Sequence, residues 1–199
     1  IRSVHTCNTS LTYLYYIINI VGCKSFYDFI AEFYGGARMT RADLAEQNFR
    51  RGLNCAQSVF LAFSDLTALD EKTALKIAAP LGGGVGRLRE ICGALSASAL
   101  VAGLLFYDAD HPTDAEKSAL YAREQELASR FRAKCGAVVC RDLLAGVETT
   151  EGARAEERTD DYYRRRPCPR ICRAAAAVLE EYLREQGILP AAPEKAERS

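Results

Sequence analysis

The feature that most constrains this chain is an uncharged run of 17 residues, Ile91–Tyr107. Alanine, glycine and serine make up much of the run, and charged residues flank it directly at Arg89, Glu90 and Asp108. The run is marginally short for a membrane-spanning helix, which needs about 20 apolar residues. We therefore predict a buried central helix, apolar all round, whose small side chains let neighbouring helices approach closely.

The rest of the body is typical of a succession of helices, because strand-like alternation is absent and Ala, Leu, Glu and Arg dominate. Good capping residues predict where four of the helices start, at Thr40, Asn54, Asp70 and Thr113. An amphipathic pattern predicts the last helix over Pro169–Gln186. The expected fold class is all-α, a single compact bundle of about six to eight helices around the central one.

The composition of the chain changes sharply at Met39, since 2 alanines precede it and 29 follow it. Gly35-Gly36 can be encoded by a ribosome-binding sequence ahead of a start codon at Met39. We interpret residues 1–38 as translated upstream sequence or a disordered extension, 39–187 as one helical domain and 188–199 as a flexible tail. This interpretation predicts a cytoplasmic protein.

The alternative for the N-terminal segment is export as a lipoprotein. Leu11–Val21 is an apolar run of about signal-peptide length. The tetrapeptide that ends at Cys23 resembles a lipoprotein cleavage box, which would make Cys23 the lipid anchor.

Charge and histidine content exclude several function classes. The chain has 26 Lys+Arg against 26 Asp+Glu, so it lacks the basic excess of a general nucleic-acid binder. With only 2 His, zinc catalysis through histidine and a Ser-His-Asp mechanism are disfavoured. The 8 Cys are unusual, and they indicate sulfur chemistry.

Four cysteines share one local setting, the start of a predicted helix: Cys55, Cys92, Cys140 and Cys168. Cys168, between two prolines, is the predicted N-cap of its helix. A helix N-terminus carries partial positive charge, and a thiol there can have its pKa lowered from ~8.5 to the ~3.5–7.5 range. We predict that the four converge on one pocket, as catalytic thiols or as ligands of a metal or iron–sulfur cluster. Cys135 and Cys172 are expected outside the pocket or at its edge.

The alternative is that these cysteines only pack, as small buried hydrophobes in an alanine-rich bundle. The sequence has no CxxC pair, so a shared site has to be assembled from separate helices. The glycine-rich run Gly82–Gly86 lacks the GK[ST] of a phosphate-binding loop, which favours a tight turn. In the functional interpretation, backbone N–H groups line the sulfur pocket and contact a bound cofactor, at Gly83, Gly84, Gly86 and Gly93. Arg164–Arg166 is typical of a solvated face.

These motifs, in order, resemble the redox-active family named for its C_GCAxxG_C_C cysteine pattern. The resemblance covers roughly residues 39–183 and rests on five segments: Asn54–Val59, Gly82–Arg87, Cys92–Ala94, Cys140–Leu144 and Cys168–Ile171. It implies that the family's four cysteines fall on Cys55, Cys92, Cys140 and Cys168. One departure is Ala97, which stands where the family's CGAxxG motif has its last glycine.

The resemblance implies a class of protein and leaves the reaction open. The family consists mainly of small bacterial and archaeal proteins, often encoded near transporters and oxidoreductases. One expectation is a redox protein that uses thiol–disulfide exchange or a cysteine-ligated iron–sulfur cluster, with an unidentified redox partner. The alternative is a non-enzymatic helical module with a structural metal or packing cysteines.

Overall fold

A computed structural model describes residues 39–191, and within them the chain is all-α, as predicted. Two short 3₁₀ turns occur at Ser64–Leu66 (η1) and Ala79–Leu81 (η2). The eight α-helices of this range are α3 (Arg41–Arg50), α4 (Cys55–Leu61), α5 (Glu71–Ala78), α6 (Gly93–Phe106), α7 (Asp114–Cys135), α8 (Cys140–Leu143), α9 (Asp160–Arg165) and α10 (Cys168–Glu185).

The predicted helix starts are confirmed by their caps. Thr40 and Asn54 form reciprocal capping boxes with Asp43 and Gln57, so two free N–H groups are satisfied at each start. Asp70 caps α5 through the N–H of Thr73, and Thr113 caps α7 through the N–H of Glu116. The box at α7 is only half formed, because the Glu116 carboxylate accepts from the N–H of Asp108 instead.

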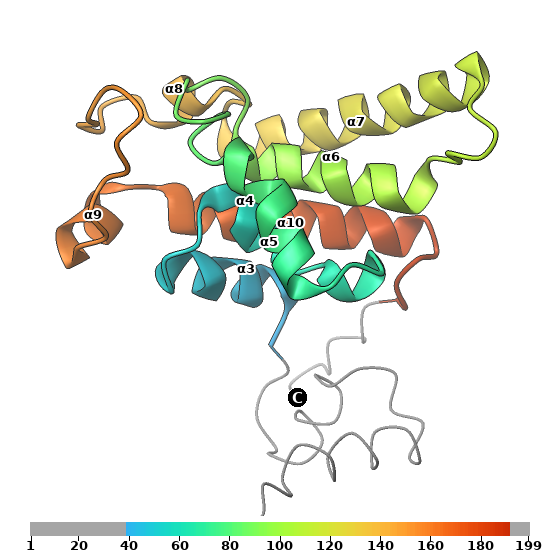
Figure 1. The fold of residues 1–199 in the computed structure, drawn as a ribbon, viewed down its shortest axis with the longest axis horizontal. Coiled ribbons are helices and arrows are strands. Elements are labelled where there is room, and N and C mark those ends of the chain that lie inside the picture. The colour runs from blue at the N-terminus through green and yellow to red at the C-terminus, as the bar shows by residue number, and fades with distance from the viewer. Residues whose placement is uncertain (1–38, 192–199) are drawn as a thin grey trace, which may run out of the picture. The chain divides into compact units, whose positions relative to one another are not determined.

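The core lies where α4, α6, α7 and α10 pack on one another, and α3 covers α4 and α10. In Figure 1, α6, α7 and α10 run side by side. The predicted central helix is α6, but only its first ten residues are largely buried, whereas Leu104 in its last turn is 49% exposed. The buried half is the half that begins at the cysteine-bearing end, so the core supports the site described below.

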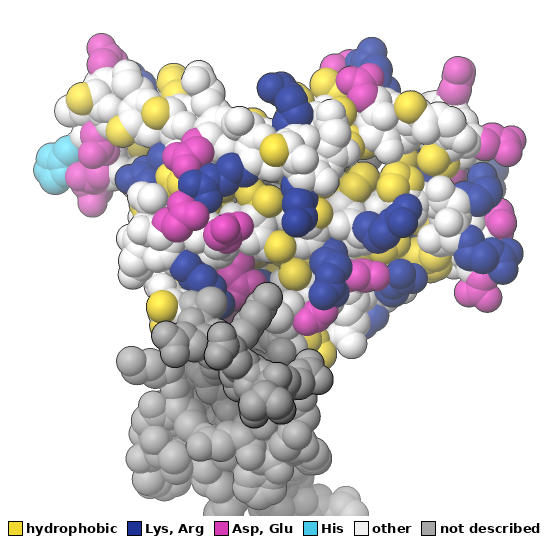
Figure 2. Space-filling model, turned by 180° about the vertical axis from the view of Figure 1, so that it is seen from behind, with side chains coloured by type: hydrophobic (Ala, Val, Ile, Leu, Met, Phe, Trp, Pro, Cys, Tyr) yellow, Lys and Arg dark blue, Asp and Glu magenta, His cyan; other side chains and the backbone are white. Residues whose placement is uncertain are grey.

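Charges of both signs are mixed over the surface. On the face shown in Figure 2, basic and acidic side chains alternate, and neither sign gathers into a continuous patch. Among residues 39–191, no helix combines the length and apolar character needed to cross a membrane.

The two ends of the chain are only partly covered by the structure. Residues 1–38, with the candidate lipid anchor Cys23, lie outside the described residues, as do residues 192–199. Ile188 and Leu189, at the start of the predicted tail, turn back on α10, and both backbone N–H groups donate to the carbonyl of Leu183.

Candidate functional site

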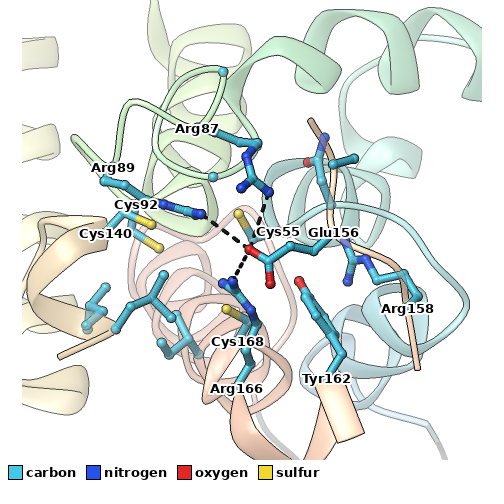
Figure 3. Close-up of a pocket in the computed structure, with 18 of the residues that line it drawn as sticks. Cys55, Arg87, Arg89, Cys92, Cys140, Glu156, Arg158, Tyr162, Arg166 and Cys168 are labelled. Atoms are coloured by element: carbon cyan, nitrogen blue, oxygen red, sulfur yellow. Dashed lines mark hydrogen bonds and ion pairs between the residues drawn. The ribbon is translucent and has the colours of Figure 1, made fainter. Parts of the chain in front are cut away.

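One cavity of about 270 Å³ is lined by all four of the predicted cysteines. Cys55, Cys140 and Cys168 are the first residues of α4, α8 and α10, and Cys92 is the N-cap residue of α6. Cys168 was predicted as a cap, but Pro167 takes that position and Cys168 is the first helical residue. Figure 3 shows the four sulfurs facing a common space together with several arginines.

Cys92 and Cys140 meet through a short backbone pairing. Ile91 and Val139 form an isolated antiparallel bridge. The N–H of Cys92 donates to the carbonyl of Val138 (2.9 Å), and the N–H of Cys140 donates to the carbonyl of Glu90 (2.6 Å). Successive side chains of extended backbone point to opposite faces, so Cys92 and Cys140 share the face opposite the bridge pair.

Cys55 is the central sulfur of the group. Burial raises the pKa of each of the other three pocket thiols and of Cys172, and negative charge on Cys55 adds to each of these shifts. Its sulfur lies directly over Gly93, where an added Cβ would be 2.8 Å from Cys55 Sγ and 2.5 Å from the Leu81 carbonyl oxygen. Because Gly93 has no side chain, it leaves the space that the Cys55 sulfur occupies.

We expect Gly93→Ala to lower the free energy of unfolding by about 1–3 kcal/mol, because Leu81 and Cys55 have to move. Gly103→Ala is the matched control in the same helix, since its added Cβ meets nothing within 4 Å. The control should raise stability by about 0.5–1 kcal/mol, the usual helix preference of alanine over glycine. Urea denaturation of both variants measures the difference, and equal shifts would contradict this packing role.

The other candidate glycines divide into two groups. Gly83 and Gly86 line the cavity with their backbone, as the functional interpretation expects of N–H donors near the pocket. Gly84 does not line it; an added Cβ there would lie 2.7 Å from Cys140 Cβ and 2.8 Å from the Glu90 nitrogen. Gly84 and Gly93 therefore set the spacing of the cysteines.

The glycine loop aims two arginines into the cavity. All five residues from Gly83 to Arg87 have φ between +55° and +71°, and Arg89 has φ +63°. Non-glycine residues adopt this region at a cost of roughly 1–2 kcal/mol each. Arg87 and Arg89 both line the cavity, so the strained backbone presents their side chains to it, where both approach Glu156 (Figure 3).

Three arginines share a single carboxylate in the cavity wall. Glu156 Oε1 lies 2.5 Å from Arg166 Nη2, 3.4 Å from Arg87 Nη1 and 3.6 Å from Arg89 Nη2. Burial raises the pKa of Glu156, but the hydrogen bond and charge of Arg166, with help from Arg87, lower it overall. Glu156 is therefore ionised at neutral pH and neutralises one of the three cations.

The expectation that Arg164–Arg166 is a solvated face is wrong for Arg166. Its side chain is 5% exposed, whereas those of Arg164 and Arg165 are 74% and 45% exposed. Arg166 follows the last residue of α9 and lies four residues after the buried Tyr162, so both fall on the inner face. The guanidinium stacks over the Tyr162 ring at 4.8 Å. The spacing of four residues from Tyr162 is the only signal in the sequence that distinguishes Arg166 from Arg164 and Arg165.

Arg158 is a fourth cavity arginine that the sequence interpretation missed. It stacks on an aromatic cluster, 4.5 Å from the ring centre of Phe49 and 4.7 Å from that of Tyr162. Burial raises the pKa of Tyr162 to about 12, although the charge of Arg158 opposes the shift. Tyr162 is therefore a neutral phenol at physiological pH.

The predicted lowering of thiol pKa values is not observed. Burial raises the pKa of Cys140, and it raises that of Cys168 to about 12; charge on Cys55 adds to both shifts. Burial likewise raises the pKa of Cys92 well above its ordinary value. Arg89 and Arg166 pull the pKa of their neighbours Cys140 and Cys168 down, but desolvation of the charged form outweighs them. These thiols are protonated at neutral pH.

Cys135 and Cys172 do not line the cavity. Cys135 ends α7 and is half-buried, whereas Cys172 is fully buried next to the site, and its thiol approaches the carbonyl of Cys55 at 3.8 Å. All six cysteines of the described range are free thiols. In that range, no three His, Cys, Asp or Glu side chains are arranged to hold one metal ion.

The site residues coincide with a known cysteine signature. Residues 53–182 match the family described as "Putative redox-active protein (C_GCAxxG_C_C)", more than half of the 199-residue chain. The match begins after α3, later than the resemblance near Met39 suggested, and includes all four cavity cysteines. Neither a curated protein nor a solved structure matches the chain. The chain thus belongs to the redox-active family named for the C_GCAxxG_C_C pattern.

Proposed function

We propose that this protein is a thiol–disulfide redox protein whose reacting groups are Cys55, Cys92, Cys140 and Cys168. The single observation that supports this is the convergence of four thiols, from four separate helix starts, on one cavity. Chance packing of cysteines as small hydrophobes does not require that they share a solvent-connected space with arginines. The family membership supports redox activity in general.

The proposed reaction transfers two electrons to an external disulfide, R–S–S–R. One cavity thiol, as its thiolate, attacks a sulfur of that disulfide and displaces RS⁻, which leaves a mixed disulfide on the protein. A second cavity thiol then attacks the mixed disulfide and displaces the other RS⁻. The protein gains one disulfide, and its two thiol protons end on two RSH molecules.

We propose that Cys55 is one of the two cavity thiols that form the protein's disulfide. It is the one thiol that contributes, after burial, to the raised pKa of all three other cavity thiols, so it lies within electrostatic reach of each of them. Arg89 and Arg166 lie beside Cys140 and Cys168, where a guanidinium stabilises a departing thiolate. Cys55 is therefore the proposed partner in the first disulfide.

The test is oxidation of the reduced full chain by the neutral probe 2-hydroxyethyl disulfide, followed by alkylation and mass mapping. We expect one intramolecular disulfide that contains Cys55. Cys55→Ser cannot form it and should slow oxidation of the remaining cavity thiols by about tenfold or more. Because the thiolate is the attacking form, the rate should rise from about pH 7 to about pH 9. Cys135→Ser, outside the cavity, is the matched control and should react like the parent chain. Disulfides that use only Cys135, or none at all, would refute the proposal.

A metal-bound function is the alternative that the same cysteines suggest. The described side chains do not form a ligand set for a metal ion as they stand, so we derive no step through iron or zinc. An anaerobic absorption spectrum with metal analysis of the native protein distinguishes the two functions. A stoichiometric iron–sulfur chromophore would contradict thiol–disulfide exchange as the main role.

The proposed setting is a reducing compartment. Six free cysteines in the described range suit the cytoplasm better than an oxidising compartment, so we propose a cytoplasmic location. The proposed partner is a disulfide-bearing protein or small molecule. Nucleic acid is not proposed as a partner, because the net formal charge is zero.

A further inference from the structure

The cavity carries more positive charge than its own residues neutralise. Four arginines line it, Arg87, Arg89, Arg158 and Arg166, and Glu156 is the only acidic residue among the lining groups. The cavity cysteines other than Cys55 have raised pKa values, so they supply little negative charge at neutral pH. Buried charges are normally paired, so an excess of this size favours the binding of an anion.

Two guanidinium nitrogens in the cavity are donors that an anion could accept from. Arg89 Nη2 and Arg158 Nη1 are buried and have no hydrogen-bond partner among the described residues. Arg89 Nη2 lies 3.6 Å from Glu156, which is close enough for charge attraction and too far for a hydrogen bond. A buried donor without a partner is destabilising, more so when it is charged, so an acceptor at these nitrogens would be stabilising.

The other two arginines have structural partners. Arg87 donates through Nε to the Gly152 carbonyl (2.8 Å) and through Nη2 to the Thr150 carbonyl (2.7 Å), which ties the glycine loop to the segment before α9. Arg166 donates to Glu156 at 2.5 Å. Arg158 Nη2 also donates to the Leu53 carbonyl (3.4 Å), so in Arg89 and Arg158 the partnerless groups are one nitrogen each, Arg89 Nη2 and Arg158 Nη1.

We propose that the cavity binds a small molecule with an oxyanion group, held by Arg89 and Arg158 beside the cysteines. A cavity of about 270 Å³ has the volume of roughly nine liquid waters, which admits an inorganic oxyanion or a small carboxylate compound. Guanidinium groups match carboxylate and tetrahedral oxyanions through paired N–H donors. Glu156 already places one carboxylate oxygen among three of these arginines, which shows that the wall accepts this chemistry.

The binding test uses the reduced full chain and inorganic sulfate at constant ionic strength. Sulfate binding is measured by calorimetry and by the rise in melting temperature. Arg89→Gln should weaken sulfate binding by about tenfold or more, the loss expected for one charge-assisted hydrogen bond. Arg50→Gln is the matched control, because Arg50 is 52% exposed and pairs with Glu46 on the surface. It should bind like the parent chain.

The ligand-free variants supply a second readout. Arg89→Gln removes an uncompensated buried charge, so its melting temperature without anion should equal or exceed that of the parent chain. Arg87→Gln breaks three hydrogen bonds to the 150–152 segment and should melt lower. If Arg89 had only a structural role, Arg89→Gln would melt lower than the parent chain without anion. Sulfate binding that neither Arg89→Gln nor Arg158→Gln weakens would overturn the proposal.

The two anion sources are distinguished by a charge series of small disulfides. The thiol reaction with dithiodiglycolate, neutral 2-hydroxyethyl disulfide and cationic cystamine rests on the proposed function, whereas sulfate binding does not. A faster reaction of the diacid, lost in Arg89→Gln, assigns the oxyanion to the sulfur substrate. Sulfate binding without this preference assigns it to a free oxyanion. Disulfide formation with no anion binding would reject this inference alone, and binding with no disulfide would reject the proposed function alone.

Discussion

Replacement of Ser98 by arginine is expected to lower the free energy of unfolding by about 4–5 kcal/mol, the range of an unpaired buried charge. Ser98 is 3% exposed in the buried half of α6, and its hydroxyl donates only to the carbonyl of Ala94, one turn earlier. No acidic residue lies in α6 to pair with the new guanidinium. Since small domains are stable by about 5–15 kcal/mol in total, the variant should be largely unfolded at moderate urea concentrations.

The matched control places the same side chain elsewhere on the same helix. Leu104 is 49% exposed in the last turn of α6, so the Leu104→Arg variant can keep its charge in water. Its stability should lie within about 1 kcal/mol of the parent chain. Urea denaturation followed by circular dichroism measures both variants. A Ser98→Arg protein as stable as Leu104→Arg would show that the first half of α6 is not core.

The reduced protein should lose stability steeply as the pH rises from about 8 to about 10. Burial raises the pKa of Cys168 to about 12, whereas an unfolded thiol ionises near ~8.5. The unfolded chain therefore releases a proton that the folded chain keeps, and above pH ~8.5 this favours unfolding. For Cys168 alone, the free energy of unfolding falls by about 2 kcal/mol by pH 10, and this loss is absent below pH ~8. Cys92, Cys140 and Cys172, whose pKa values are also raised by burial, add to the loss.

Cys168→Ser isolates the contribution of this one thiol. Serine does not ionise in this range, so the variant should lose about 2 kcal/mol less than the parent chain between pH 8 and pH 10. Urea denaturation at the two pH values, with a reductant present throughout, gives the difference. Identical pH dependence in the two proteins would mean that the Cys168 thiolate is not disfavoured in the folded state.

The helical fold is predictable because its signals are local. Thr40, Asn54, Asp70 and Thr113 each hydrogen-bond an N–H group three residues away, so their sequence positions suffice to locate the helix starts. The uncharged run Ile91–Tyr107 around Ser98 likewise predicts a buried helix, because the lack of charge can be read directly from the sequence. The extent of its burial was not predictable, because the exposure of Leu104 depends on where neighbouring helices end.

The cysteine set was predictable and its electrostatics were not. Position at a helix start is a local property, and it identified Cys55, Cys92, Cys140 and Cys168. The pKa shifts of Cys92, Cys140 and Cys168 have the opposite sign to the prediction, because desolvation depends on all the segments that close over a thiol. Burial outweighs the helix end even for Cys92 and Cys168, which stand at the starts of helices of 14 and 18 residues.

The contacts of Glu156 with Arg87, Arg89 and Arg166 in the cavity wall belong to the tertiary structure. Arg87 and Glu156 are 69 residues apart in the chain, and each is an ordinary charged loop residue in the sequence. Only folding brings them together, through a glycine loop with positive φ and a segment that crosses the cavity before α9. The sequence alone thus determined the helices and the identity of the thiols, because both follow from short-range hydrogen bonding and composition. The charge around the sulfurs, and the two arginine nitrogens without partners, were decided by long-range packing, because the free energy of a buried charge depends on every group that surrounds it.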